Sequence, residues 1–275
     1  MISRREWLSG AAATVAVSGM LRADPLGMPI GVQTWIVRDA LQKDFTGTLH
    51  LLADSGFRAI EMCSPPGYGW TSLANIGAAQ MRKTIEAAGL HCESSHYQFQ
   101  ELKKSLDERI AFAKDLGLTQ MVVSTFALPA TATMADWLGA AAELNAIGEK
   151  TRKAGIQLGF HNHDFEFREI DGALVYDKLM GAFDPNLVKM QFQVGVISLG
   201  YKAETFMRKY PGRFLSMHLA DYSPAEKKQV PMGQGAVNWP DVFSAAKLAG
   251  VKNYFVEMDL ELMKASIPYL HSLKA

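Results

Sequence analysis

The sequence predicts an α/β fold, a single (β/α)8 TIM barrel, on three observations. Helical patterns alternate with short apolar segments along nearly the whole chain, as they do in parallel βα units. Six helical stretches end in Gly and pass directly into an apolar segment, which is a common way for a helix to stop before a strand. The chain has 275 residues, and a barrel of this type takes roughly 250. With 48% hydrophobic and 20% charged residues, the chain can bury one core.

The expected strands follow along the chain. Residues 30–35 form the first, and residues 188–194 form the sixth, which is entered after Asp184-Pro185. The helix-ending glycines introduce strands two, three, four, five, seven and eight, at Gly56, Gly89, Gly117, Gly155, Gly212 and Gly250. The clearest helical patterns cover residues 135–154 and 239–249, the second with Asn238 as a candidate N-cap and Pro240 in its first turn.

An open, doubly wound sheet is the structural alternative. A dinucleotide-binding version of it would carry a GxGxxG motif after the first strand, and the sequence has none there. Gly233-Gln234-Gly235 comes late in the chain and is expected to be a loop. Nothing after residue 28 resembles a linker, so residues 28–275 are predicted to form one catalytic barrel domain.

Residues 1–27 have the pattern of a bacterial export signal and linker. Arg4-Arg5 precede a short, weakly hydrophobic stretch, as in twin-arginine signals, which predicts a periplasmic or exported protein. A cytosolic N-terminus with two chance arginines is the alternative. No apolar run reaches the roughly 20 residues of a stable membrane span.

Composition argues against several other classes of protein. The formal net charge is zero, whereas nucleic-acid-binding domains usually carry a basic surplus, so no nucleic-acid partner is expected. Cys63 and Cys92 form neither a disulfide framework nor a CxxC metal motif. The sequence carries no signal for an oligomeric state.

Strand alternation predicts which side chains face the barrel interior. Residues of one parity share a face, so the apolar members of each strand are assigned to the helical layer and their neighbours to the interior. Polar residues then turn inward near the carboxyl ends of six strands, where barrel enzymes keep their active sites. They are Glu61, His96, His161, His163, Gln193, His218, Glu257 and Asp259.

Such a cluster suits a divalent metal. Imidazole nitrogens together with carboxylate and amide oxygens are suitable ligands for Mn²⁺, Co²⁺, Zn²⁺ or Fe²⁺. A single histidine at this rim would more often be a packing residue. Four histidines with several carboxylates are harder to explain that way, since unpaired buried polar groups cost roughly 1–3 kcal/mol each. A metal-free polar pocket is the alternative.

The segments 159–167 (GFHNHDFEF), 210–222 (YPGRFLSMHLADY), 233–239 (GQGAVNW) and 254–259 (YFVEMD) resemble the xylose-isomerase-like superfamily of sugar phosphate isomerases and epimerases, in particular its HNH branch, which is similar to inosose dehydratase. The resemblance implies one divalent metal held at the ends of strands five to eight. The matching positions are His161, Gln193, His218 and Glu257.

Two of these positions depart from the epimerase pattern. His161 replaces a Glu on strand five, and Gln193 replaces an Asp on strand six. With only Glu257 left as a carboxylate among the ligand positions, the resemblance implies one-sided chemistry, in which a proton is removed next to a carbonyl and elimination or isomerisation follows. Glu257 is the expected base, and His163 is expected to move a proton at the opposing oxygen.

The expected substrate is an unphosphorylated sugar, keto-sugar or inositol-type compound. Trp35 and the Tyr68–Trp70 pair are expected to stack on its ring, although Trp35 could equally be a core residue. The substrate-binding set is Glu61, His96, Trp35, Trp70 and Asp259. Two other functions remain open: a non-catalytic sugar-binding barrel that has lost its metal, and a DNA-repair endonuclease of the same superfamily.

Overall fold

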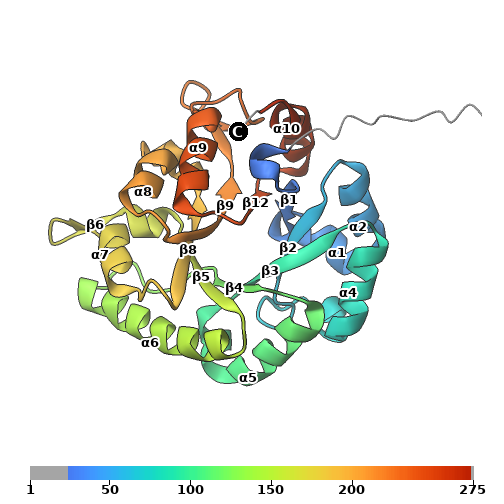
Figure 1. Ribbon diagram of the computed structural model, residues 1–275, viewed down its shortest axis with the longest axis horizontal. Coiled ribbons are helices and arrows are strands. Elements are labelled where there is room, and N and C mark those ends of the chain that lie inside the picture. The colour runs from blue at the N-terminus through green and yellow to red at the C-terminus, as the bar shows by residue number, and fades with distance from the viewer. Residues whose placement is uncertain (1–23, 274–275) are drawn as a thin grey trace, which may run out of the picture.

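The computed structural model describes residues 24–273, and its centre is a closed barrel of eight parallel strands (Figure 1). Around the barrel the order is β1, β12, β9, β8, β5, β4, β3 and β2, which closes on β1. The bounds are Gly31–Gln33 for β1, Ala59–Cys63 for β2, His91–Tyr97 for β3, Gln120–Val123 for β4, Gln157–His161 for β5, Val188–Gln193 for β8, Phe214–Leu219 for β9 and Asn253–Val256 for β12. The prediction of a barrel is therefore confirmed, and the open sheet is wrong.

Helices form the outer layer of the barrel (Figure 1). They are α1 (Arg38–Lys43), α2 (Phe45–Asp54), α3 (Thr71–Ala74), α4 (Ala78–Ala87), α5 (Phe99–Leu116), α6 (Met134–Lys153), α7 (Val175–Ala182), α8 (Ala203–Lys209), α9 (Trp239–Ala249) and α10 (Leu260–Ser272). The two helices with the clearest sequence patterns are α6 and α9, and both bounds agree with expectation to within one residue. Asn238 occupies the N-cap position of α9 and Pro240 lies in its first turn, as expected, although the Asn238 side chain makes no capping hydrogen bond.

The core separates into an apolar outer layer and a polar interior. Leu158 and Phe160 of β5 and Met217 and Leu219 of β9 are fully buried, and they have the parity assigned to the helical layer. The intervening positions, such as Ser216 and His218, are equally buried but polar. Alternation along each strand therefore places a cluster of hydrogen-bonding groups inside a barrel whose outer shell is hydrophobic.

Two short hairpins sit at the carboxyl-terminal end of the barrel. Strands β6 (Glu169–Ile170) and β7 (Ala173–Leu174) follow β5, and β10 (Asp221–Ser223) and β11 (Lys228–Val230) follow β9. Within the described residues there are also four three-ten helices: η1 (Pro25–Gly27), η2 (Thr34–Val37), η3 (Asp164–Phe167) and η4 (Val194–Leu199). Segments of two or three residues carry too little periodicity to be predicted from sequence.

The loop around Gly233-Gln234-Gly235 is organised by Asp221. This fully buried carboxylate accepts hydrogen bonds from the backbone of Gly233 (2.9 Å) and Gly235 (3.3 Å) and from Trp239 Nε1 (2.8 Å). A Cβ on Gly235 would lie 2.1 Å from Asp221 Oδ1, so only glycine fits there. The GQG segment is a loop, as expected. Gly235 packs against the Asp221 carboxylate, and Gly233 has a φ of 84° and lies against the ring of Tyr269.

No helix within residues 24–273 is long and apolar enough to cross a membrane. The proposed export signal, with Arg4-Arg5, lies outside the described residues and stays a prediction.

Candidate active site

Glu61 is the centre of the polar interior. Its side chain, on β2, is fully buried and accepts hydrogen bonds from four other strands. The donors are Gln33 Nε2 at 2.6 Å, Ser94 Oγ at 2.5 Å, Gln191 Nε2 at 2.8 Å and His218 Nε2 at 2.5 Å. A buried carboxylate with this many donors is held ionised and fixed in orientation.

His218 bridges two carboxylates. Its Nε2 donates to Glu61 Oε2, and its Nδ1 lies 2.9 Å from Oε2 of Glu257, the residue that follows β12. Burial by itself would lower the pKa of His218, but Glu257 and Glu61 and their hydrogen bonds raise that pKa to about 9. Without a bound cation, this pKa favours protonation of both ring nitrogens, so that His218 is an imidazolium between two carboxylates.

The pKa values of Glu61 and Glu257 are lowered, whereas that of His218 is raised. Burial would raise the pKa of Glu61, yet His96 and His218 and the hydrogen bonds from His218 and Ser94 hold it at about 2. Burial likewise works against ionisation of Glu257, but the charge and hydrogen bond of His218 lower its pKa below the ordinary value. Two carboxylates and one imidazolium leave the cluster with one net negative charge, which favours a cation.

The other histidines of the cluster are neutral. Burial lowers the pKa of His96, and burial together with the neighbouring His218 and His163 takes the pKa of His161 well below its usual range. His96 Nε2 donates to Gln191 Oε1 at 2.6 Å. Nδ1 of His161 is buried and has no hydrogen-bond partner among the described residues. An unpaired nitrogen on a neutral imidazole is the form in which histidine binds a metal.

The cluster fits a divalent metal. His96, His161 and His218 each offer a ligand atom, and these atoms lie within 4.8 Å of one another. His161 and His218 belong both to this triad and to the set predicted from sequence. The Nε2 of His96 already has Gln191 as a partner, which leaves His161 as the freer ligand. Glu61 on the far nitrogen of His218 is the outer carboxylate that commonly orients a metal-binding imidazole.

Gln193 lies beside Glu257 as its hydrogen-bond donor. Its Nε2 is 2.6 Å from Glu257 Oε2, and its Oε1 accepts from the backbone of Gly195 at 3.1 Å. The amide therefore fixes the carboxylate by donating to it. Of the four predicted ligand positions, the structure links Gln193, His218 and Glu257 directly, with the ring of His161 4.4 Å from that of His218 between centroids.

A cavity of about 330 Å³ opens next to this cluster, over the ends of β5, β8 and β9. His163 is half-buried at its edge, and burial lowers the pKa of its imidazole below the ordinary value. The backbone N–H of His163 donates to Glu166 Oε2 at 2.7 Å, which holds the turn after β5. The lining residues are His163, Asp164, Phe165, Gln193, Gly195, Ser198, Ala220 and Gln229.

Three other residues predicted to contact substrate, Trp35, Trp70 and Asp259, lie outside this cluster. Trp35, in η2 after β1, is 38% exposed, and it stacks on Trp70 with ring centroids 6.5 Å apart. Trp70 is only 2% exposed, so it packs against Trp35 and is not accessible to a ligand. Asp259 is exposed at the start of α10 and makes no side-chain hydrogen bond with the cluster within residues 24–273. The structure does not bring Asp259 into the site.

Strand parity places Gln191 and Ser216 inside the barrel, but sequence reasoning gave neither them nor Gln33 and Ser94 a role in the site. Gln33 donates to Oε2 of Glu61, Gln191 and Ser94 donate to Oε1, and Ser216 accepts from Gln191 at 2.9 Å. All four have the inward parity of their strands. The signal that could have found them is a polar residue at an inward position on each of four strands, β1, β3, β8 and β9.

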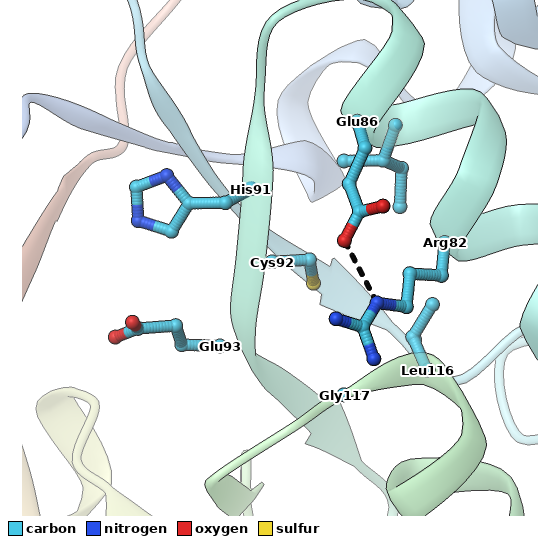
Figure 2. Close-up of a pocket in the computed structure, with 8 residues that line it drawn as sticks. Arg82, Glu86, His91, Cys92, Glu93, Leu116 and Gly117 are labelled. Atoms are coloured by element: carbon cyan, nitrogen blue, oxygen red, sulfur yellow. Dashed lines mark hydrogen bonds and ion pairs between the residues drawn. The ribbon is translucent and has the colours of Figure 1, made fainter.

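The opposite end of the barrel has a separate cavity of about 170 Å³ near the start of β3 (Figure 2). His91 and Glu93 extend to one side of the strand and Cys92 to the other, toward Arg82, which is ion-paired with Glu86 at 2.8 Å. The amino-terminal face of such barrels serves stability, and catalytic residues come from the carboxyl-terminal face. This cavity is therefore not a candidate reaction site.

Comparison with known proteins agrees with this architecture. A sugar phosphate isomerase/epimerase from Parabacteroides distasonis superposes with a TM-score of 0.78 at 24% identity, over 94% of this chain and 98% of that one. A probable 3-DHS dehydratase from Bacillus anthracis gives 0.70 at 12% identity, over 88% and 98%. A xylose isomerase-like TIM barrel protein from Mycobacterium smegmatis, in complex with magnesium, gives 0.65 at 16%, over 90% and 97%.

Among curated proteins none matches the chain. The family model described as xylose isomerase-like TIM barrel matches residues 49–270, most of the barrel. The expectation from the HNH, GQG and YFVEMD segments is thereby confirmed at the level of the family. The chain belongs to the xylose isomerase-like TIM barrel family.

Proposed function

We propose that the protein is a metal-dependent isomerase, epimerase or lyase that removes a proton next to the carbonyl of a sugar, keto-sugar or inositol-type substrate. The observation that carries this proposal is the Glu61–His218–Glu257 chain, which leaves one net negative charge beside an unpartnered His161 nitrogen at the catalytic end of the barrel. Family membership and neighbours that are named as sugar isomerases, epimerases or dehydratases support the same reading.

The residues proposed to hold one divalent metal are His161, His218 and Glu257, with Gln193 beside them. A metal in such a site polarises a carbonyl as a Lewis acid and favours removal of the adjacent proton. Mn²⁺, Co²⁺, Zn²⁺ and Fe²⁺ suit this mixture of nitrogen and oxygen donors. The magnesium named for the Mycobacterium smegmatis neighbour is a harder ion that prefers oxygen ligands.

Glu257 is the proposed base. Its lowered pKa keeps it ionised at neutral pH, so it is ready to accept a proton. Its Oε2 is already used by Gln193 and His218, while Oε1 has no hydrogen-bond partner among residues 24–273. We assign proton abstraction to this second oxygen. A base needs a free lone pair within reach of the substrate, and the partly exposed Glu257 carboxylate can offer one.

His163 is the proposed second proton carrier. It is neutral, since burial lowers the pKa of its ring, and it lies at the edge of the 330 Å³ cavity. Its Nδ1 has no partner in the described part of the chain. A neutral imidazole with one free nitrogen can accept a proton from, or return one to, the oxygen that leaves or receives it.

The deciding experiment measures metal content and proton exchange on the same preparation. Protein purified without chelator should contain about one divalent metal per chain, and it should exchange the proton next to the carbonyl of a keto-sugar or inosose with deuterium from the solvent. EDTA should abolish the exchange, and Mn²⁺, Co²⁺ or Zn²⁺ should restore it. If none of these metals binds and no exchange occurs while sugars still bind, the protein is a sugar-binding barrel and the proposal is wrong.

A further inference from the structure

We infer that the cavity beside Glu257 is a binding subsite for a neutral second sugar ring, stacked on Phe165, so that the protein takes glycosides in preference to sugar phosphates. The inference rests on the proposed function and narrows its substrate class. Phe165 follows β5 in η3 and is 59% exposed, although it is a large apolar side chain. It lines the cavity with His163, whose ring centroid lies 6.0 Å away.

The polar lining of the cavity is suited to hydroxyl groups. Asp164, Ser198 and Gln229 come from three different segments, and their side chains make no hydrogen bonds to one another or to other described residues. Sugar recognition combines an exposed aromatic face with a few convergent polar groups of this kind. A carboxylate, a hydroxyl and an amide together supply both donors and acceptors for a sugar's hydroxyls.

The charge of the cavity argues against a phosphate group. None of the eight lining residues is Lys or Arg, and Asp164 contributes a negative charge. Phosphate recognition relies on Arg, Lys, or clustered backbone donors. At this cavity a phosphorylated sugar would meet repulsion, and a neutral ring would not.

Trp35, a second exposed aromatic at the rim, bears on the size of the ligand. Trp35 follows β1, and Phe165 follows β5. In the closed strand order β1 and β5 stand four places apart among eight, so they lie on opposite sides of the barrel. A ligand that contacts both aromatics must cross the mouth of the barrel, at whose rim Glu257 lies after β12. One ring would then be placed over the reacting centre and a second over Phe165.

Equilibrium binding tests the subsite without requiring turnover. The probes are maltose and cellobiose as neutral disaccharides, methyl glucoside as a single ring, and glucose 6-phosphate, each titrated into the full chain and followed by saturation-transfer NMR. We expect the better disaccharide to bind about tenfold more tightly than methyl glucoside, as one stacked ring can provide. Glucose 6-phosphate should bind no better than methyl glucoside.

Variants then assign the preference to Phe165. Phe165→Ala should remove the roughly tenfold advantage of the disaccharide and leave methyl glucoside binding unchanged, whereas Phe165→Tyr, which keeps the ring, should retain it. Leu248→Ala, at a 70% exposed leucine of α9, is the matched control and should have no effect. An unchanged ratio in Phe165→Ala, or tighter binding of glucose 6-phosphate than of the disaccharides, would overturn the subsite.

The same preparations separate this inference from the proposed function. Deuterium exchange on keto-sugars with no disaccharide preference would leave the proposed function standing and overturn the subsite. A disaccharide preference that depends on Phe165, without metal or exchange, would support the subsite and overturn the proposed chemistry.

Discussion

Replacing Glu257 by Gln should abolish proton exchange while leaving the barrel folded. The carboxylate accepts from Gln193 Nε2 at 2.6 Å and from His218 Nδ1 at 2.9 Å, both through Oε2. An amide oxygen at the same place can still accept both bonds, so the local packing is retained. The substitution removes the negative charge and the lone pair proposed to take the substrate proton. Loss of a general base costs about 10²- to 10⁴-fold in rate, and we expect exchange to fall within that range.

A second consequence of Glu257→Gln concerns its neighbour. Glu257 is the largest of the influences that raise the pKa of His218 to about 9, so this pKa should fall in the variant. NMR titration of the His218 ring measures the fall, and solvent-deuterium exchange into a keto-sugar measures the chemistry. Asp259→Asn is the control, since Asp259 lies two residues further on and is exposed. Near-wild-type exchange in Glu257→Gln would refute the assignment of the base and transfer that role to a histidine.

Three further predictions concern stability and localisation. Asp221→Asn should lower the free energy of unfolding in urea by about 2–4 kcal/mol, because an amide leaves buried donors unpaired. The control Asp241→Asn, at an exposed ion pair, should lower it by less than about 1 kcal/mol. Equal effects of the two substitutions would contradict the role of Asp221. Burial raises the pKa of the Glu166 carboxyl to about 8, so its contribution to stability is full below its ordinary value of 4.5 and is lost as the pH rises toward 8. Glu166→Gln should therefore flatten the decline of Tm between about pH 5 and pH 8, and an unchanged slope would count against it. Replacing Arg4-Arg5 by Lys-Lys should leave the protein in the cytoplasm, and undiminished periplasmic accumulation would exclude twin-arginine export.

The inward-facing residues could be predicted from sequence because strand alternation is a local rule. Once strands were placed by their apolar members, parity alone assigned Glu61, His161 and His218 to the interior, and all three are buried there. The rule fails where the strand stops. Backbone pairing of β12 ends at Val256, and the chain turns into α10, so parity does not extend to Asp259.

The hydrogen-bond partners in the site could not be predicted in the same way. Glu61 was expected to contact substrate, yet it lies beneath the histidines and accepts from Gln33, Gln191 and His218. Depth along the barrel axis depends on the stagger between strands, which the sequence of one strand does not encode. Trp70 illustrates the same limit, because its burial under Trp35 depends on how a loop packs on the rim.

If the site holds the proposed metal, the charges of Glu61 and Glu257 can compensate for the neutral amide of Gln193, where the resemblance implies an acidic ligand. An Asp at this position would place a second carboxylate next to Glu257, whereas the amide donates a hydrogen bond to it and fixes its orientation. The negative charge that strand β8 lacks is present on Glu61 of β2, on the other side of His218. A cation at His218 Nδ1 would displace one proton from the imidazolium, and the two carboxylates would then balance a divalent charge. Under the proposed function, Glu61 acts on the metal through His218, and Glu257 is the acidic group proposed to face the substrate.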